Sequence, residues 1–352
     1  MIYINARFLT QDLTGVQRFA ESISVALSKI RKDLVFVSPD NIKRKDVAEL
    51  LNVKVVGKHT GHYWEQIELP GFLKSNDNPL LVNLGNTSPV RYNNKISTLH
   101  DITYKKYPKS YSLKFRLLYD IIIPRVLKTS SALITVSDFS KKEISNFYHY
   151  PEKDIHVIYN ASSEVFKRTS ALDEQPFFMA VSSNNYHKNF HGLISAFEKI
   201  SENSNVKLKI IGGTNRSFAA SNLSSDLLKS GRIELLGRVS DDELVTLYNS
   251  ALAFIFPSFY EGFGIPPLEA QACACPVVSS NQASMPEVLR DSALFFDPRD
   301  EATFVQALDR IVQDQALRES LVNKGSENVK RFSWDISANK LNQLINSLNK
   351  AQ

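Results

Sequence analysis

Two glutamates, Glu261 and Glu269, have seven residues between them in a stretch whose composition suits ligand binding. The apolar run 251–256 just before them has the length and the composition of a buried strand. Gly262 and Gly264 permit a tight turn whose backbone N–H groups can approach a ligand closely. Two prolines then suit the first turn of a helix. We therefore predict a strand, a glycine turn and a helix with Glu269 in its first turn, an arrangement that binds anions.

The stretch 254–269, with Cys-Pro-Val-Val-Ser at 275–279, closely resembles the E-x7-E signature of the retaining GT-B glycosyltransferases, in particular family 4. The strand, the Glu-Gly-Phe-Gly turn and the Pro-Pro-Leu-Glu-Ala segment fit that signature in register. The spacing alone is weak, because an acid in the first turn of a helix also stabilises the helix. With these neighbours the signal is strong. The resemblance is tight over 250–290 and looser over nearly all the rest of the chain.

This resemblance implies a metal-independent hexosyltransferase that moves a sugar from a nucleotide-diphosphate sugar to an acceptor hydroxyl with retention. The expected setting is the biosynthesis of a cell-surface polysaccharide, such as the O-antigen of lipopolysaccharide, a capsule or an exopolysaccharide. Two alternatives stay open: a non-catalytic GT-B scaffold of a polysaccharide assembly complex, and a GT-B sugar-nucleotide epimerase. A dinucleotide dehydrogenase is disfavoured, because no G-x-G-x-x-G follows a strand. The donor base, the sugar, the acceptor and the linkage are not readable from the sequence.

The resemblance also assigns roles to individual residues. Glu269 would accept hydrogen bonds from the ribose hydroxyls, and Glu261 would hold the donor sugar or, as a second possibility, act covalently. The other donor-binding positions that it implies are Gly15, Asn189, Arg238, Val239, Gly262, Phe263 and Gly264.

The loop 182–189 resembles the diphosphate-binding segment of the family, which usually reads Arg-Lys-Asn. Lys188 is therefore the expected catalytic cation for the diphosphate. His187 stands where the family has arginine, which leaves open whether a second fixed cation exists. A protonated His187, Arg216 or Arg238 could supply it.

A predicted strand over 95–101 ends in His100 and Asp101. The carboxyl ends of strands are where parallel α/β sheets bind ligands. A lone histidine is more often structural, but in the resembling family a His-Asp pair at this position lies by the donor sugar. We therefore expect His100 to take part in catalysis, with Asp101 orienting it or contacting the acceptor.

Gly15 follows the first predicted strand at the start of a predicted helix, where a phosphate could bind. Thr14 and Gln17 fit a capping box, with Thr14 as N-cap. The string Thr-Gly-Val-Gln-Arg resembles the N-terminal glycine loop of the family, whose glycine amide faces the donor phosphates and the acceptor. Arg7 and Arg18 flank this loop; either could be an ordinary surface arginine, which we favour over a binding role.

The chain has 352 residues, more than a single domain usually holds, so two domains are expected. Strand patterns alternate with helix patterns, as in parallel α/β sheets. We predict a Rossmann-like N-terminal domain over 1–165 on the acceptor side and a Rossmann-like donor domain over 166–332. A last helix, 333–352, would cross back onto the first domain. In the GT-B fold that the resemblance implies, the two domains face each other across a cleft.

Composition narrows the setting further. A net charge of +5 does not by itself imply nucleic acid. No apolar stretch could span a bilayer, and no signal peptide is recognisable. Cys273 and Cys275 are expected to be buried and free. We expect a cytoplasmic protein without a cofactor. Since no Asp-x-Asp occurs to hold a metal, helix N-termini and Lys188 must neutralise the leaving diphosphate.

A basic and aromatic segment, 104–116, directly follows the His-Asp pair. It holds five Lys or Arg residues and no acid, and tyrosines and a phenylalanine lie between them. This mixture suits the headgroup level of an anionic membrane, although a solvated basic face has the same composition. The expected acceptor is a glycan or a lipid-linked glycan. We therefore predict reversible peripheral contact with the inner face of the membrane.

Overall fold

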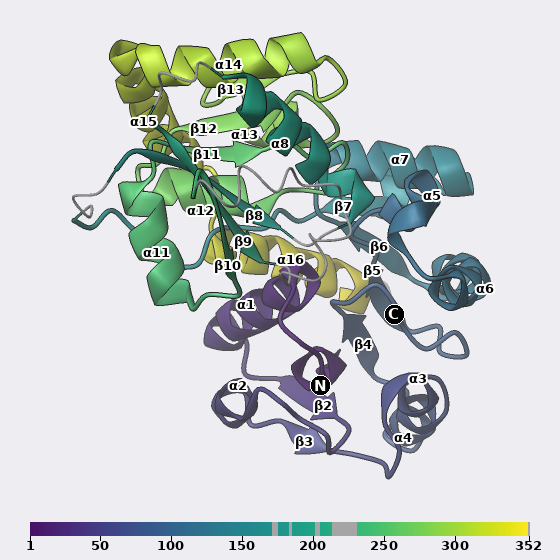
Figure 1. The fold of residues 1–352 in the computed structure, drawn as a ribbon. Helices are drawn as coiled ribbons and strands as arrows, with labels where there is room; N and C mark the ends of the chain where they lie inside the picture. Colours follow the sequence, from purple (N-terminus) through teal and green to yellow (C-terminus); the bar gives the residue numbers. More distant parts are fainter. Residues whose placement is uncertain (171–174, 183–184, 201–204, 213–230, 351–352) are drawn as a thin grey trace. The chain divides into compact units, whose positions relative to one another are not determined.

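The computed structural model describes residues 1–170, 175–182, 185–200, 205–212 and 231–350. The chain forms two compact units (Figure 1). Unit 1 comprises Met1–Asn160 and Ser333–Gln352, and unit 2 comprises Ala161–Phe332. Each unit contains a parallel sheet with helices packed on it, as predicted.

Unit 1 contains a seven-stranded sheet with the order β3-β2-β1-β4-β5-β6-β7. Because β2 and β3 lie on one side of β1 and β4 to β7 on the other, the topological switch point lies between β1 and β4. Its strands are β1 (Ile2–Asn5), β2 (Leu34–Ser38), β3 (Lys54–Val55), β4 (Leu80–Asn83), β5 (Lys95–Thr98), β6 (Ala132–Thr135) and β7 (Ile155–Val157). Its helical segments are η1 (Arg7–Thr10), α1 (Gly15–Ile30), α2 (Lys45–Leu50), α3 (Gly61–Tyr63), η2 (Trp64–Glu68), α4 (Leu69–Lys74), α5 (Thr103–Lys106), η3 (Pro108–Ser110), α6 (Leu113–Thr129), α7 (Asp138–Tyr148), η4 (Glu152–Asp154) and α16 (Trp334–Lys350).

Unit 2 repeats this plan with a six-stranded sheet of order β10-β9-β8-β11-β12-β13, so its switch point lies between β8 and β11. Its strands are β8 (Phe177–Ser182), β9 (Lys207–Gly212), β10 (Ile233–Gly237), β11 (Ala253–Phe256), β12 (Val277–Ser280) and β13 (Leu294–Phe296). Its helical segments in the described residues are η5 (Tyr186–Lys188), α8 (Phe190–Lys199), α11 (Asp241–Ser250), α12 (Ile265–Ala272), α13 (Met285–Leu289), α14 (Glu301–Gln313) and α15 (Gln315–Val329).

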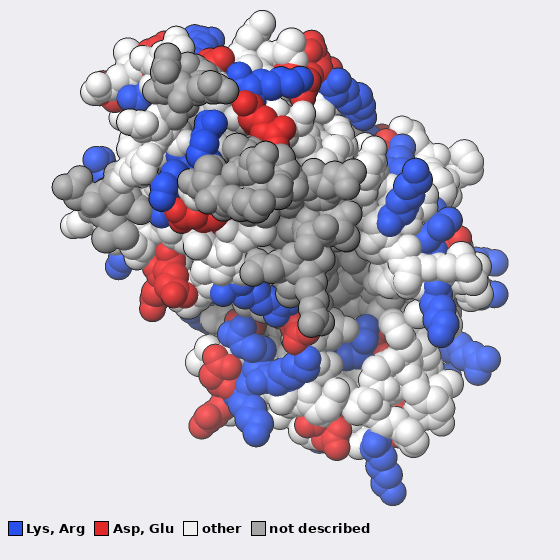
Figure 2. Space-filling model, in the orientation of Figure 1, with Lys and Arg blue, Asp and Glu red and all other residues white. Residues whose placement is uncertain are grey.

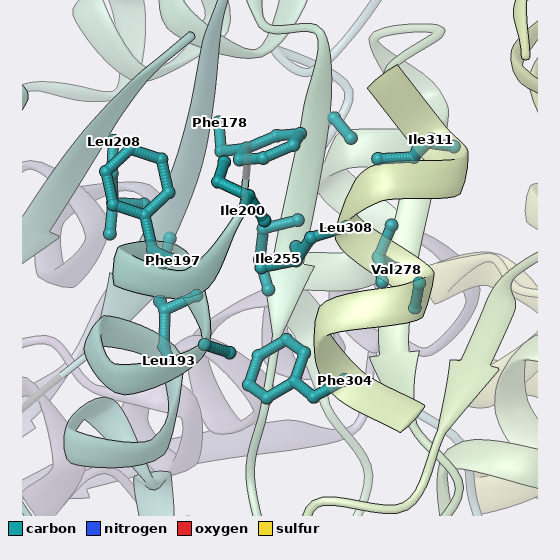
Figure 3. Close-up of a cluster of buried hydrophobic side chains, with 14 of the residues drawn as sticks. Phe178, Leu193, Phe197, Ile200, Leu208, Ile255, Val278, Phe304, Leu308 and Ile311 are labelled. Carbon is teal, nitrogen blue, oxygen red and sulfur yellow. The ribbon is translucent and has the colours of Figure 1, made fainter. Parts of the chain in front are cut away.

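One face of the unit 2 sheet packs against helices α8 and α14 (Figure 3). Phe197 of α8 and Leu308 of α14 lie over Phe178 and Ile255, which come from the two strands at the switch point. All four side chains are fully buried. Burying an apolar side chain of this size contributes about 1.5–3 kcal/mol each. This core therefore fixes β8 and β11, whose carboxyl ends carry the predicted donor-binding loops.

The C-terminal helix α16 belongs to unit 1, where it packs against α1 (Figure 1). Arg31, directly after α1, donates from Nη1 to Asn342 at 2.7 Å and to Asn346 at 2.6 Å. The Ser337 hydroxyl donates to the carbonyl of Tyr159 at 2.6 Å. The prediction that the last helix returns to the N-terminal part of the fold is confirmed.

The capping box predicted at the start of α1 is wrong. Thr14 is the N-cap residue of α1, but its side chain caps no backbone N–H. Its hydroxyl donates to the side chain of Gln17 instead, so the capping box is not formed. Pro124 lies inside the single helix α6 and does not divide it. Buried Ile123 and Leu127 anchor that helix on both sides of the proline.

Cys273 and Cys275 are buried and free, as predicted. Burial raises the pKa of the Cys273 thiol to about 12, and it raises the pKa of Cys275 as well. Both thiols therefore stay protonated near neutral pH. They fill space at the end of α12 and carry no reactive thiolate.

Candidate active site

The loops at the switch point of unit 2 bring two of the predicted catalytic residues together. Strands β8 and β11 are parallel neighbours, and each is followed by a loop that carries one charged side chain. Lys188 Nζ lies 2.6 Å from Glu261 Oε1. The two side chains are 21% and 13% exposed, so a ligand can still reach both. A cation and a carboxylate thus meet at the edge where such sheets bind ligands.

Backbone contacts hold these two loops against each other. The N–H of Phe259 donates to the carbonyl of His187 at 2.8 Å. Asn189 adopts the left-handed conformation, with φ of 55°, at the N-cap of α8. Its side chain is buried, and its amide donates to the carbonyl of Pro298 at 3.4 Å. Asparagine tolerates this conformation better than most residues. Asn189 therefore shapes the loop that presents Lys188.

The glycine turn is formed as predicted. Gly264 is the N-cap of α12 with φ of 87°, a conformation that side chains rarely adopt. The buried hydroxyl of Ser284 lies 3.0 Å from the carbonyl oxygen of Glu261 and 3.1 Å from that of Phe263, and it donates to both. Gly262 and Phe263 are buried in the same turn. The hydroxyl of Ser284 thus holds the turn in place, which favours a fixed direction for its backbone N–H groups.

Glu269 is not in the first turn of its helix. Helix α12 begins at Ile265, so Glu269 is its fifth residue and the first turn holds no acid. The helix begins there because Gly264 provides the left-handed N-cap. Glu269 is only 4% exposed. It is therefore a nearly buried carboxylate in the second turn, and a contact with a ligand remains a prediction.

The candidates for a second cation are distributed unevenly. His187 is buried, 5% exposed, so it does not present an open cation to the loop. Arg216 lies outside the described residues. Arg238 is exposed and Val239 is half-buried between β10 and α11. Among the candidates that the structure describes, Arg238 is an accessible arginine.

In unit 1, Gly15 is the first residue of α1 and is exposed. The helix has no acid in its first turn, so the positive end of its dipole is not compensated within the helix. This position agrees with the predicted helix N-terminus after the first strand. Whether a phosphate binds there stays a prediction.

His100 is buried and its ring packs edge-on against Phe19 with 5.0 Å between the ring centroids. Its Nε2 lies 3.0 Å from the carbonyl oxygen of Leu84 and donates to it. Burial lowers the pKa of His100, so the ring is neutral near pH 7. Asp101 accepts a hydrogen bond from the backbone N–H of Thr103 at 2.8 Å. Any contact of His100 with a donor would therefore use Nδ1.

The sequence analysis missed a charged pair at the switch point of unit 1. Arg7 Nε lies 3.1 Å from Glu65 Oε1, and the two side chains are 13% and 1% exposed. The interpretation of Arg7 as a surface arginine is therefore wrong. Asn5 and Asn83, the last residues of β1 and β4, lie beside this pair. The recognisable signal was a polar residue at the end of each central strand, since those ends meet at one edge.

The basic segment 104–116 is partly neutralised. Lys105 pairs with Asp120 at 2.6 Å, and Lys106 pairs with Glu143 at 2.7 Å. The other three basic residues form no ion pair with a described residue; they are Lys109, Lys114 and Arg116. On the side of unit 1 that carries α6 and α7, Figure 2 shows more blue than red. Among the described residues, no helix is long and apolar enough to cross a membrane.

Comparison with known proteins supports the family assignment that the sequence motifs suggest. Residues 162–328 match the family model "Glycosyl transferases group 1", and residues 89–162 match "Glycosyltransferase Family 4". O-antigen chain mannosyltransferase B of Escherichia coli is 32% identical over 70% of this chain and 68% of its own length. O-antigen chain mannosyltransferase RfbU of Salmonella typhimurium is 28% identical over 86% of this chain and 85% of its own.

A solved structure supports the fold independently of sequence. HepE from Anabaena, solved in complex with UDP and glucose, superposes with a TM-score of 0.74 over 98% of this chain and 99% of its own. Its sequence identity is only 15%, so this likeness concerns the fold alone. The chain therefore belongs to the glycosyl transferases group 1 family, the family 4 glycosyltransferases, and has the GT-B fold.

Proposed function

We propose that the protein transfers a mannosyl residue from GDP-mannose to a hydroxyl of a growing cell-surface glycan. Two relatives that match most of the chain are named O-antigen chain mannosyltransferases, which supports mannose as the sugar. The observation that carries the proposal is the Lys188–Glu261 pair at the switch point of unit 2, inside the stretch that matches the family.

The roles of the donor-site residues follow from their chemistry. Lys188 binds the diphosphate and neutralises it as it leaves, and Glu261 accepts hydrogen bonds from the sugar hydroxyls. Glu269 accepts hydrogen bonds from the ribose. The other proposed donor contacts are Gly15, Asn189, Arg238, Val239, Gly262, Phe263 and Gly264, with His100 beside the sugar and Asp101 on the acceptor side.

The reaction retains the configuration of the anomeric carbon. The acceptor oxygen forms its bond to that carbon on the face from which the diphosphate leaves, and the bond to the phosphate oxygen breaks. The leaving phosphate oxygen takes the proton of the acceptor hydroxyl. Positive charge from Lys188 and from helix N-termini takes the place of a metal ion.

The acceptor is proposed to be a lipid-linked glycan at the inner face of the membrane, with the enzyme bound there peripherally. Leu113, Leu117 and Ile121 on helix α6 are 64%, 54% and 56% exposed. Their spacing of four residues places them on one face of the helix. Lys114 and Arg116 lie between them in sequence. An apolar stripe among basic residues suits the boundary between anionic headgroups and acyl chains.

The first test is a thermal-stability screen with GDP-mannose, UDP-glucose and dTDP-rhamnose. A ligand at about 100 times its Kd adds roughly 2.7 kcal/mol to the stability of the state that binds it. GDP-mannose is expected to give the largest shift, and Lys188→Met is expected to abolish it. Lys207→Met removes a comparable pair in the same unit, Lys207–Glu234 at 2.8 Å, and should leave the shift unchanged.

Two results would contradict the proposal. The absence of stabilisation by all three nucleotide sugars would favour a non-catalytic scaffold. Conversion of the free donor to another nucleotide sugar without an acceptor would favour an epimerase. Slow release of GDP from GDP-mannose into water supports a transferase.

A further inference from the structure

The switch point of unit 1 carries a polar cluster that the proposed donor site does not use. Asn5 and Asn83 end strands β1 and β4 and lie opposite each other in the sheet register. The carboxyl ends of parallel strands at a switch point are where such sheets bind ligands. We call the side chains gathered there the unit 1 polar cluster; it consists of Asn5, Arg7, Glu65, Asn86, Thr87, Asp101 and Tyr119.

Glu65 is the buried centre of this cluster. Its Oε1 accepts from Arg7 Nε and from Asn5 Nδ2, each at 3.1 Å, and its Oε2 accepts from the Thr87 hydroxyl at 2.7 Å. Burial opposes ionisation, but the charge of Arg7 and the hydrogen bonds bring the pKa of Glu65 down to about 2. The carboxylate is thus ionised at neutral pH. A buried charge pair contributes little net stability compared with apolar side chains of the same size. Stability alone therefore does not account for this pair.

The backbone around Glu65 is built to hold it in place. Glu65 lies in η2, a π-helical segment, and such segments are frequent at functional sites. On one side, Trp64 Nε1 donates to the carbonyl of Val56 at 2.6 Å. On the other side, Gln66 donates to the carbonyl of Ser88 at 3.0 Å and accepts from the N–H of Val90 at 2.9 Å. Glu65 is thereby fixed between two anchored neighbours.

Arg7 keeps donors that the protein does not use. A guanidinium has five N–H groups. Nε donates to Glu65, and Nη2 donates to the Thr87 hydroxyl at 2.9 Å. Nη1 makes no hydrogen bond to a described residue, and the side chain is 13% exposed. Glu65 and Thr87 therefore fix the guanidinium plane while its other edge stays available to a ligand.

Further polar groups lie near the Arg7–Glu65 pair. The side chain of Asn86 lies near the Tyr119 hydroxyl, and it accepts from the backbone N–H of His100 at 2.9 Å. Burial raises the pKa of Tyr119 to about 12, and the charges of Arg7, Glu65 and Asp101 act on the same hydroxyl. A phenol that keeps its proton can both donate and accept. The cluster thus offers donors and acceptors side by side.

The charge of the cluster selects among ligands. Arg7 carries its positive charge, while Glu65 and Asp101 carry two negative charges. Protonation of His62, whose Nδ1 lies 3.6 Å from Glu65, would at most bring the sum to zero. A phosphate gains no net attraction from such a site. A sugar hydroxyl, which is neutral and both donates and accepts, suits it well.

We propose that the unit 1 polar cluster binds hydroxyls of an uncharged acceptor sugar, with Arg7 in direct contact and Glu65 as its positioning residue. This inference rests on the proposed glycosyl transfer. It implies that the enzyme extends a glycan, so an earlier glycosyl transfer must place a sugar on the carrier. An enzyme that starts the chain on a lipid phosphate would need a cationic site instead.

The test separates acceptor use from donor chemistry in the full chain. GDP release from GDP-mannose into water reports on the donor site, and transfer to octyl α-D-mannopyranoside reports on the acceptor site. Arg7→Lys and Arg7→Met are expected to raise the acceptor KM on the order of 10- to 100-fold. GDP release without acceptor should stay within about twofold of wild type. Arg7→Lys keeps a charge beside Glu65, so it tests the site even if Arg7→Met unfolds.

A second readout, the preference between a neutral and a charged acceptor, tests the charge argument. A merely structural role of Glu65 would leave this preference unchanged. Wild type should use the neutral mannoside far better than the same mannoside carrying a 6-phosphate. Glu65→Gln removes one negative charge and should narrow this preference by on the order of tenfold. Equal loss of activity toward both acceptors would overturn the positioning role of Glu65.

A matched control lies in the same unit. Arg31 pairs with Asp33 at 2.7 Å and its side chain is 12% exposed, similar to Arg7. Arg31→Met should leave the acceptor KM unchanged. No GDP release from wild type contradicts the proposed function itself. Intact GDP release, with either an unchanged acceptor KM in both Arg7 variants or no transfer to the mannoside, overturns this inference alone.

Discussion

Lys188 and Glu261 are held together at 2.6 Å but stay partly exposed. An ion pair between two partly buried side chains contributes little net free energy, because the desolvation of both charges offsets their attraction. A diphosphate with about two negative charges can therefore displace the carboxylate from Lys188 at small cost. The freed Glu261 would then turn to neutral sugar hydroxyls. The pair keeps both side chains near their working positions.

At the residue scale we first predict the effect of Glu269→Ala. A hydrogen bond to a charged group is worth about 1.5–3 kcal/mol, so donor affinity should fall roughly 10- to 150-fold. The measurement is the Kd for GDP-mannose by calorimetry. Because Glu269 is only 4% exposed, Glu269→Gln serves as the size-matched variant, and its thermal unfolding is compared with wild type. An unchanged Kd in both variants would remove Glu269 from the donor site.

The second residue-scale prediction concerns Lys95, which is fully buried in β5. Its ammonium donates to the carbonyls of Tyr92 and Thr129 at 2.6 and 3.0 Å and to the Thr129 hydroxyl at 2.6 Å. Burial lowers the pKa of Lys95 from 10.5 to about 7. Between these values the unfolded chain holds one proton more than the folded chain. The contribution of Lys95 to stability therefore rises with pH, by about 1.4 kcal/mol per unit at most.

Comparison of Lys95→Met with wild type isolates this effect. The variant should gain most, relative to wild type, below pH 7, where the buried lysine is charged. Its advantage should shrink as the pH rises toward 10.5. Urea unfolding at about pH 6 and about pH 9 measures the difference. Lys128→Met, at an exposed position near the end of helix α6, should show no such trend. A pH-independent difference for Lys95→Met would contradict the assigned cause.

At the scale of elements, α6 shows why the basic segment could only be partly interpreted from the sequence. The partners of Lys105 and Lys106 are Asp120 on α6 and Glu143 on α7, far along the chain. No local pattern reveals such pairings. The segment therefore appeared to carry more unneutralised positive charge than it does in the folded protein. The exposed apolar stripe of α6 was equally hidden, because period alone does not say which face of a helix packs on the sheet.

We predict that α6 gives the protein reversible affinity for anionic membranes. Three unpaired basic residues contribute about 1 kcal/mol each near such a surface, and the apolar stripe adds to this. The test is co-sedimentation with vesicles of phosphatidylserine and phosphatidylcholine, and with phosphatidylcholine alone. Lys109, Lys114 and Arg116 changed together to Ser should abolish the preference for anionic vesicles. Leu113→Ser with Leu117→Ser should weaken binding to both.

Two comparisons make this experiment decisive. Lys105→Ser with Lys106→Ser removes charges that are already paired, so it should have a smaller effect than the triple change. Salt should release the wild type, because the Debye length shrinks to about 3 Å at 1 M. Equal sedimentation of wild type and the triple variant would mean that the segment is an ordinary solvated face.

For the molecule as a whole, the two units share one architecture, a parallel sheet with a topological switch point. Each sheet places a charged pair at its switch point, Lys188–Glu261 in unit 2 and Arg7–Glu65 in unit 1. The first pair was predictable, since the Glu-Gly-Phe-Gly and Lys-Asn motifs lie in recognisable sequence. The second was not, because Glu65 comes from a π-helical segment in a stretch without a clear period. Its position depends on which strands become neighbours, a property of the whole sheet.

For the whole molecule, the last prediction concerns the source of the positive charge that neutralises the leaving diphosphate. The sequence contains no Asp-x-Asp. Within the described ranges, no group of three or more His, Cys, Asp or Glu side chains is placed to bind a metal ion. In the proposed mechanism the positive charge for the leaving diphosphate comes from Lys188 and from helix N-termini. Mannosyl transfer from GDP-mannose should therefore proceed at the same rate in excess EDTA as without it, and added magnesium or manganese should bring no gain. Lys188→Met should be inactive under all of these conditions, because no ion would take over its role. Loss of turnover in EDTA, restored by magnesium or manganese, would contradict this mechanism and would indicate a metal site beyond the described residues.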